Sequence, residues 1–591
     1  MRSSRSPFLL HPFLVPALMG LAPDASAQGC DTHHHEESPR DREEAGHAIR
    51  WRHPAFRFER AERMRLLSIN DFHGQIDTGR VVSKRPVGGG PVLAAYFSAA
   101  ADSFPDRTFI VHAGDHVGAT PPNSALLQDE PSISFLNTVG NRFCTEFWRE
   151  NPLCNVVGTL GNHEFDEGKN ELMRLYKGGN HPKGPFLESP WRGAEYPLIS
   201  SNVFIAGTGR TLLPAYNVKL LKGIPVGFIG AVLKETPTIV TPAGVAGLEF
   251  RDEAGSINKA AAELRRLGVR AMVVLIHQGG SQPSFAGSTP ETGAAPVSGV
   301  IQGIIADLSD DIDVVVSGHT HQFTNAFLKN RNGKTILVTQ SFANSTAFGQ
   351  IDLELDRISR DVVGMAARII TTWADEGPGL APDPKVRAQV DRANAMVAPL
   401  VNRIVGTAAR DISAAQNPAG ESALGNLIAD AQAASVDAEI AFMNPGGIRA
   451  DMKAGTLTWG ALFTIQPFGN DVVKMKLTGA QILALLNQQW AGQTSPRFLQ
   501  ISGLAYAWDS ALPAGSKVVE IRRAGRSIAP DEVFVVACNG FLAGGGDNFT
   551  VFKEGTDRVV GPVDLDALVD FVSTRTQPID YAIEGRISRT N

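Results

Sequence analysis

Short apolar runs that end abruptly in a polar, metal-ligating side chain recur through the first half of the chain. The runs are rich in β-branched residues, which is typical of buried strands. Five of them are followed closely by Asp, Asn or His, and they span residues 64–70, 108–114, 156–161, 271–276 and 313–318. The pattern therefore predicts five strands whose ends carry side chains of one chemical class.

Apolar residues at helical spacing appear between these strands, as in residues 256–267. Buried strands that alternate with helices indicate α/β layers. In such sheets the polar groups just beyond the strand ends converge on one edge, so we expect these groups to form one site. A single Asp-x-His or Gly-Asp pair would indicate only a turn. His112 lies inside a strand run, and we expect it to be a hydrogen-bonded core residue.

A break in the chain separates two predicted domains. Residues 377–382 are rich in Gly and Pro, and Asp383 with Pro384 can begin a helix that connects the domains. With 591 residues the chain can form two to four domains of about 150 residues or more. The predicted organisation is a signal peptide at 1–27, a polar linker at 28–62, a first α/β domain at 63–372, a linker and connecting helix at 373–404, and a second α/β domain at 405–591.

The net charge argues against a polynucleotide as the main partner. The chain has 55 Lys and Arg residues against 61 Asp and Glu residues, a net charge of −6. No excess of positive charge is therefore present to neutralise a nucleic-acid backbone. The content of 43% hydrophobic and 20% charged residues is that of a globular protein.

The N-terminus has the features of a secretory signal. Arg2 and Arg5 precede an apolar stretch at 8–22, which is followed by Ala-Ser-Ala at 25–27. This order predicts cleavage after residue 27 and an exported protein, either periplasmic or extracellular. The stretch is too short to cross a bilayer, and no other run approaches about 20 uninterrupted apolar residues. We therefore expect no membrane span.

Four cysteines occur, at positions 30, 144, 154 and 538. Cys144 and Cys154 are close in sequence, and an exported chain meets oxidising conditions. We therefore expect a disulfide between them, with free buried thiols as the alternative.

Seven residues beyond the strand ends form a set of metal ligands: Asp71, His73, Asp115, Asn162, His277, His319 and His321. Asp71 and His73 can face one ion together with His321, and Asp115 can bridge to a second ion completed by the remaining three. Nitrogen and oxygen ligands without thiolate suit Zn, Mn, Co or Fe, and do not distinguish among them. Two divalent ions can activate water and hold the oxygens of an in-line phosphoryl displacement.

Five motifs follow one another in the first predicted domain: Asp71-x-His73, Gly114-Asp115, Gly161-Asn162-His163-Glu164-Phe165-Asp166, His277 and Gly318-His319-Thr320-His321. They resemble the calcineurin-like metallophosphoesterase domain, in the order and spacing of the 5′-nucleotidase/UDP-sugar hydrolase family. The resemblance implies a four-layer α/β/β/α domain at 63–372 with a dimetal site. It also implies a catalytic dyad, in which His163 stabilises charge on the phosphoryl group and Asp166 orients the imidazole. A His with an Asp partner beside a metal ligand agrees with these roles.

The second predicted domain has four further motifs: residues 421–427, Asn444-Pro445-Gly446-Gly447-Ile448-Arg449, Pro467-Phe468-Gly469, and 541–547. They resemble the C-terminal 5′-nucleotidase domain. The resemblance implies a substrate site made of Asn444, Gly447, Arg449, Phe468, Phe541 and Asp547. In that site Arg449 would contact phosphate oxygens, the two Phe rings would sandwich the base, and Asp547 would bind the ribose hydroxyls. One position departs from the pattern, because several relatives carry an Arg where this chain has Gly420.

These observations predict a secreted dimetal phosphohydrolase that releases phosphate from nucleoside 5′-monophosphates by attack of metal-activated water. Alternatives on the same scaffold are hydrolysis of UDP-sugars, and 2′,3′-cyclic-nucleotide phosphodiesterase with 3′-nucleotidase activity. A different class, a non-catalytic nucleotide-binding surface protein, is disfavoured by the complete ligand set. The expected partner is a nucleotide or nucleotide-sugar, and the oligomeric state is open.

Overall fold

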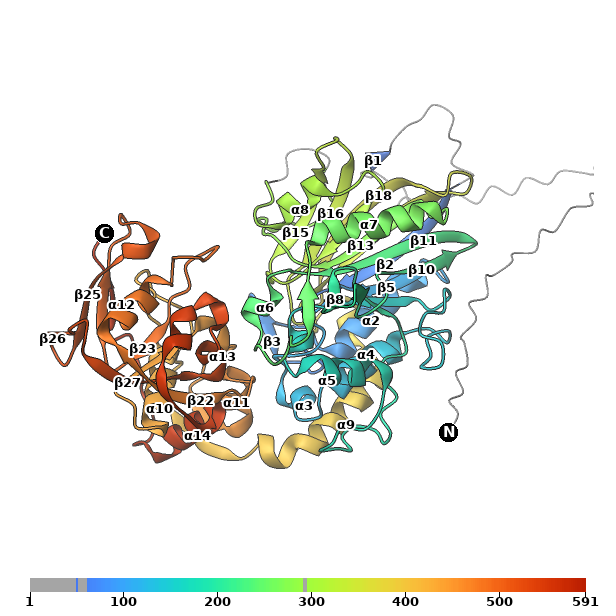
Figure 1. The fold of residues 1–591 in the computed structure, drawn as a ribbon. Coiled ribbons are helices and arrows are strands. Elements are labelled where there is room, and N and C mark those ends of the chain that lie inside the picture. The colour runs from blue at the N-terminus through green and yellow to red at the C-terminus, as the bar shows by residue number, and fades with distance from the viewer. Residues whose placement is uncertain (1–48, 51–60, 291–294) are drawn as a thin grey trace, which may run out of the picture. The chain divides into compact units, whose positions relative to one another are not determined.

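The computed structural model describes residues 49–50, 61–290 and 295–591 (Figure 1). The predicted signal peptide and nearly all of the predicted linker at 28–62 lie outside the described residues. His47–Asn591 clusters as one unit of the chain. Among the described residues we find no helix with the length and apolar character needed to cross a membrane.

Two sheets dominate the first part of the chain. The larger has the strand order β1-β18-β17-β2-β5-β6-β7, and the second has the order β10-β11-β13-β14-β16-β15. The strands of the larger sheet are β1 Ile49–Arg50, β2 Ala61–Ile69, β5 Thr108–His112, β6 Val156–Thr159, β7 Leu198–Ile199, β17 Ala347–Asp356 and β18 Val362–Thr371. Those of the second are β10 Tyr216–Leu221, β11 Ile224–Val232, β13 Ala271–His277, β14 Val314–Ser317, β15 Phe323–Lys329 and β16 Thr335–Ser341.

The two sheets pack face to face, and helices cover their outer faces. Successive strand residues point to opposite faces, so Leu66 packs between the sheets against residues such as Phe228. Its neighbour Leu67 packs under helices on the outer face of the larger sheet. Those helices are α2 Gly90–Asp102, α4 Glu130–Val139 and α5 Gly168–Lys177, and the second sheet is covered by α7 Glu253–Arg266 and α8 Ile301–Asp307. The expected α/β/β/α layers are confirmed.

Smaller elements join these layers. They are the hairpin β3 Arg80–Val82 and β4 Arg85–Val87, the three strands β8 Val203–Ile205, β9 Arg210–Thr211 and β12 Leu248–Phe250, and the short helices α3 Pro122–Ala125 and α6 Thr236–Ile239. The predicted helix after the Gly/Pro-rich break is α9, Pro384–Val401. The Asp383 carboxylate accepts hydrogen bonds from the backbone N–H groups of Lys385 and Val386, which is the capping predicted from the sequence.

The chain after α9 forms a second α/β region. Its five-stranded sheet has the order β23-β20-β27-β22-β28, and a four-stranded sheet has the order β26-β25-β24-β29. The strands are β19 Ile404–Ala408, β20 Ile440–Met443, β21 Gly455–Thr458, β22 Asp471–Thr478, β23 Gln500–Ser502, β24 Ala505–Trp508, β25 Val518–Arg523, β26 Arg526–Ser527, β27 Val533–Asn539, β28 Thr556–Val563 and β29 Ile587–Arg589. The helices are α10 Ala423–Ser435, α11 Trp459–Ile465, α12 Gly479–Asn487, α13 Gly540–Ala543 and α14 Asp564–Thr574.

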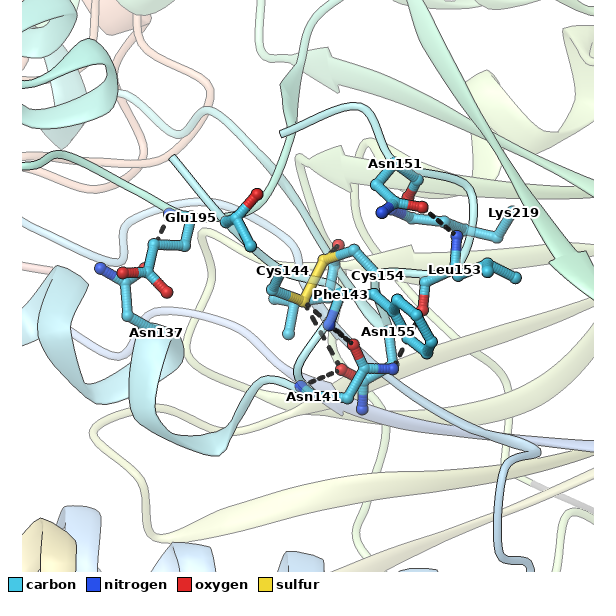
Figure 2. Close-up of a disulfide and its surroundings, with 12 residues drawn as sticks. Asn137, Asn141, Phe143, Cys144, Asn151, Leu153, Cys154, Asn155, Glu195 and Lys219 are labelled. Carbon is cyan, nitrogen blue, oxygen red and sulfur yellow. Dashed lines mark hydrogen bonds between the residues drawn. A yellow bond between two sulfur atoms is a disulfide. The ribbon is translucent and has the colours of Figure 1, made fainter. Parts of the chain in front are cut away.

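A disulfide joins Cys144 and Cys154 in the segment between α4 and β6, as predicted (Figure 2). Asn155 Oδ1 accepts a hydrogen bond from the backbone N–H of Asn141 at 2.7 Å, and Asn141 Oδ1 accepts one from Phe143 at 3.0 Å. The bridge and these bonds order the loop that leads into β6. Cys538 is a free, buried thiol.

The expectation that His112 is hydrogen-bonded is wrong. Its ring is buried, but within the described chain neither ring nitrogen has a hydrogen-bond partner. The ring occupies space above Gly158 of β6, where a Cβ atom would lie only 1.7 Å from His112 Nε2. Burial lowers the pKa of His112 well below its usual value, so the ring is a neutral packing group.

Candidate dimetal active site

The five predicted strands end at one place, and the seven predicted ligands gather there. The potential ligand atoms form three groups, and within each group the atoms lie within 4.8 Å of one another. The groups are Asp71 with His73 and His321, His73 with Asp115 and His163, and Asp115 with His277 and His319. Asn162 Oδ1 lies 3.0 Å from His319 Nδ1. Asp115 therefore lies between the Asp71 group and the His277 group, where a bridging carboxylate is needed.

The spacing of these atoms fits shared metal ions. His321 Nε2 lies 3.2 Å from Asp71 Oδ1 and 3.1 Å from His73 Nε2, and His277 Nε2 lies 3.0 Å from Asp115 Oδ2. Ligands about 2.1 Å from one ion lie roughly 3 Å from each other. The donor set also fits, because imidazole and carboxylate suit divalent transition metals.

Hydrogen bonds fix which nitrogen of two rings faces the cluster. His73 Nδ1–H donates to the carbonyl oxygen of Gly118 at 2.8 Å, and His277 Nδ1–H donates to that of Ala113 at 2.7 Å. Because a carbonyl only accepts, each Nδ1 carries a proton and each Nε2 points toward the cluster.

The electrostatics of the cluster favour cations. Burial acts to lower the pKa of His277, but the Asp115 and Asp71 carboxylates outweigh it and raise that pKa to about 10. Burial lowers the pKa of His319 to about 4 and that of His73 well below its usual value. The two carboxylates therefore stabilise positive charge, while the rings of His73 and His319 are neutral donors at neutral pH.

The ligand backbone is tightly turned. Asp71, His73, Asp115, His319 and His321 have φ values of 49°, 47°, 48°, 74° and 56°. This left-handed region costs a non-glycine residue of order 1 kcal/mol or more and is retained mainly at functional sites. Gly161 permits the close approach of two ligand loops, because a Cβ atom there would lie 2.1 Å from Asp115 Oδ1.

His163 and Asp166, the predicted dyad, are in contact. The two residues lie at the short helix η2, His163–Phe165, where Nδ1 of His163 lies 2.7 Å from Asp166 Oδ2. The backbone N–H of His163 donates to Asp115 Oδ1 at 2.9 Å. Burial acts to lower the pKa of His163, but Asp166 and then Asp115 outweigh it, so the pKa is raised. The geometry presents an imidazole that Asp166 orients beside the ligand cluster.

Glu164 supports the cluster, a role for which the sequence offered only its position beside His163. Its buried carboxylate accepts hydrogen bonds from the backbone N–H groups of Asp115 at 3.0 Å and His116 at 2.8 Å, and from that of Gly161. One carboxylate thus ties together the two loops that carry Asp115 and Asn162.

All six predicted substrate residues line one cavity with the dyad. The cavity has a volume of about 270 Å³, and its walls include His163 and Asp166 together with Asn444, Gly447, Arg449, Phe468, Phe541 and Asp547. The Phe468 ring is stacked on the His163 ring, with centroids 5.7 Å apart and planes 15° apart. The Arg449 guanidinium carbon lies 5.8 Å from the Phe468 centroid.

Asp547 is already paired within this cavity. Its Oδ2 accepts a hydrogen bond from Asn444 Nδ2 at 3.1 Å, and its Oδ1 forms an ion pair with Arg497. Arg497 also lines the cavity, and the sequence reasoning missed it. At Gly420 the ring of Phe498 takes the space of a side chain, since a Cβ atom there would lie 2.4 Å from it.

Comparison with known proteins agrees with this geometry. The calcineurin-like phosphoesterase family matches residues 64–323, and the 5′-nucleotidase C-terminal domain matches residues 403–554. The cell wall protein Lmo0130 of Listeria monocytogenes is 35% identical over 86% of this chain and 67% of its own length. The chain belongs to the 5′-nucleotidase family. The metallophosphoesterase domain of this family is a metal-dependent hydrolase of phosphate esters.

Two further proteins are similar to this chain, and they differ in how much of their own length the chain covers. Endonuclease YhcR of Bacillus subtilis is 36% identical over 89% of this chain, which spans only 41% of that protein. The crystal structure of a 5′-nucleotidase precursor from Thermus thermophilus superposes with a TM-score of 0.73 at 27% identity. It covers 90% of this chain and all of the other, so the likeness extends over both regions of the fold.

Proposed function

We propose that the protein is an exported dimetal phosphohydrolase that releases phosphate from nucleoside 5′-monophosphates. The observation that carries the proposal is the single cavity shared by the dyad and by all six predicted substrate residues. A nucleotide has a base, a ribose and a phosphate, and the cavity offers aromatic rings, a carboxylate and a guanidinium beside a metal-binding cluster.

Two divalent ions, drawn from Zn, Mn, Co or Fe, would be held by the seven ligands. Asp71, His73 and His321 would hold one ion, and Asn162, His277 and His319 the other, with Asp115 between them; this assignment follows the observed groups. When bound, such ions lower the pKa of water and withdraw charge from phosphoryl oxygens.

His163 and Asp166 would then act on the phosphoryl group. With Nδ1–H held by Asp166, an imidazolium at His163 would donate a hydrogen bond from Nε2 to an oxygen that gains negative charge in the transition state. Asp166 at 2.7 Å holds the ring in place and stabilises that charge. Neither residue needs to move a proton for this role.

The nucleoside would be held by the second region. Phe468 and Phe541 would stack on the base, Asp547 would accept hydrogen bonds from ribose hydroxyls, and Arg449 would contact phosphate oxygens. Asn444 keeps Asp547 in position through its 3.1 Å bond. We propose residues 63–372 and 405–591 as the two domains, linked at 373–404.

One observation favours a second candidate, hydrolysis of phosphodiesters. A relative that is 36% identical is named an endonuclease, although this chain spans 41% of it. The protein has a net charge of −6, which favours small substrates over polynucleotides.

Export of the protein is supported by the N-terminal pattern and by the name of the cell wall protein Lmo0130.

A substrate screen tests the proposal. Purified protein in added Mn, Co or Zn would be assayed by phosphate release from AMP, by formation of the monoester products from UDP-glucose and 2′,3′-cyclic AMP, and by p-nitrophenol release from bis-p-nitrophenyl phosphate. We expect AMP to give the highest kcat/KM, EDTA to abolish turnover, and elemental analysis to find about two ions per chain. Metal binding without turnover of any substrate would instead support a non-catalytic binding protein.

A matched pair of variants sharpens the test. Asp115→Asn changes a buried bridging ligand, whereas Asp106→Asn makes the same change at an exposed aspartate that also has a left-handed backbone, with φ of 58°. We expect the first to lose metal and activity, and the second to retain them. Equal activity of the two variants would contradict the dimetal assignment.

A further inference from the structure

A second polar cavity shares Arg449 with the cavity that contains the dyad. Its volume is about 200 Å³, and its walls include His73 and His321 of the ligand cluster, Arg449, and Arg80 of the hairpin strand β3. Arg449 lines both cavities. Both guanidinium groups and two residues of the ligand cluster therefore line one cavity.

Arg80 is held so that most of its guanidinium remains available. Its Nε–H donates to Gln75 Oε1 at 3.0 Å, and the buried Gln75 is itself fixed by a bond from its Nε2 to the carbonyl oxygen of Asp77 at 2.9 Å. The four remaining N–H donors of Arg80 have no protein acceptor among the residues that the structure describes. One neutral contact thus fixes the side chain without neutralising it.

Burial disfavours the charged form of both guanidinium groups, and Arg449 adds to this effect at Arg80. Burial, and then the positive charge of Arg449, lowers the pKa of Arg80. Burial also lowers the pKa of Arg449, while the carboxylates of Asp115, Asp166 and Asp71 act in the opposite direction from a distance. Within the described part of the chain neither Arg forms an ion pair. Two partly desolvated like charges without a carboxylate partner are a suitable arrangement for binding an anion.

We propose that Arg80 is a second cationic contact for the phosphoryl group of the substrate, in addition to Arg449. Arg80 then makes the site selective for phosphate monoesters, which are dianions, over diesters, which are monoanions. This inference rests on the proposed function.

The test compares Arg80→Gln with a matched change on the same hairpin. Lys84 is exposed at the turn between β3 and β4 and does not line the cavity, so Lys84→Gln removes one positive charge without touching the site. Arg80→Lys retains a charge but not the guanidinium fork. Each metal-loaded protein would be titrated with inorganic phosphate by calorimetry, at a pH where phosphate is a dianion. Each would also be assayed with p-nitrophenyl phosphate and bis-p-nitrophenyl phosphate.

We expect Arg80→Gln to raise the Kd of phosphate about ten-fold and to lower kcat/KM for the monoester about ten-fold, which is the scale of one charge-assisted contact. The kcat/KM for the diester should change less than about three-fold, because the diester carries less negative charge than the monoester. Arg80→Lys should lie between Arg80→Gln and the unmodified protein, and Lys84→Gln should match the latter.

Two results would overturn the inference. One is an unchanged phosphate Kd in a folded Arg80→Gln protein with normal metal content. The other is an equal loss on monoester and diester, which would make Arg80 structural. If the unmodified protein hydrolyses no monoester, the proposed function fails, but the phosphate titration still decides whether Arg80 binds the anion. If Arg80→Gln does not fold, the titration and assays of Arg80→Lys decide in the same way.

Discussion

Phe468 and Phe541 line the cavity that contains the dyad. Replacing each of them by Ala should change the kinetics in a different way. Phe541 packs on the backbone of Gly546, where a Cβ atom would lie 2.5 Å from the Phe541 ring. Phe468 is stacked on His163 with centroids 5.7 Å apart. Phe541→Ala therefore removes a surface for the base and some packing on Gly546, whereas Phe468→Ala removes a neighbour of His163, the proposed catalytic imidazole.

The magnitudes follow from these contacts. Base stacking on an aromatic ring is worth about 1–3 kcal/mol, which corresponds to a loss of about 5- to 150-fold in kcat/KM for AMP in either variant. A stacked ring pair contributes about 0.5–1.5 kcal/mol beyond its area. Phe468→Ala should therefore also slow hydrolysis of p-nitrophenyl phosphate by about 2- to 10-fold, although this substrate has no base. Phe541→Ala should leave that reaction within about two-fold, because Phe541 makes no ring contact with His163.

The assay is a comparison of kcat/KM for AMP and p-nitrophenyl phosphate in both variants at fixed metal concentration. Phe147→Ala is a control, because this side chain is 90% exposed and lies outside the cavity. Equal losses on both substrates in Phe541→Ala would show that Phe541 is structural. An unchanged AMP reaction in both variants would refute the stacking of a base in this cavity.

Three other changes test the ligand cluster and its support. His163→Ala should retain its metal and lose about 10²-fold or more in kcat, the scale of one preorganised transition-state donor; elemental analysis that finds metal lost with the rate would make His163 a ligand. Glu164→Gln should lower the free energy of unfolding by about 1–3 kcal/mol, because a Gln side chain leaves at least one of three backbone donors without an acceptor; unchanged urea unfolding and metal affinity would contradict this. Replacing Cys144 and Cys154 by Ser should cost about 3 kcal/mol of stability through the freed loop while kcat at 25 °C changes less than about two-fold; a larger loss of kcat would show that the loop before β6 positions the site.

Much of the fold and the ligand set follows from local patterns. A run of β-branched residues forms a buried strand wherever it is placed in an α/β sheet, and polar residues after it must leave the sheet at its edge. The ends of β2, β5 and β6, which share one sheet, could therefore be predicted to meet. The ends of β13 and β14 belong to the other sheet, and the packing of the two sheets brings them to the same place. The cap of α9 is equally local, since Asp383 bonds to backbone groups only two and three residues away.

Tertiary structure alone decided the contacts between side chains from distant segments. Strand periodicity specifies which face a residue occupies but not which side chain from another element meets it. Hence the stacking of Phe468 on His163, the pairing of Arg497 with Asp547, and the cavity shared by Arg80 and Arg449 had no counterpart in any sequence spacing. The mistaken expectation for His112 has the same origin.

One physical cause separates the features that the sequence determined from those that the tertiary structure decided. Local hydrogen bonding and the burial of apolar runs act over a few residues, so the amino-acid sequence by itself determined the strands, the connecting helix and the polar residues that follow the strands. Charge, stacking and hydrogen bonding across the site depend on distances of a few Å between segments hundreds of residues apart. The folded chain therefore decided which groups surround the metal ligands, and with them the selectivity that we propose for this site.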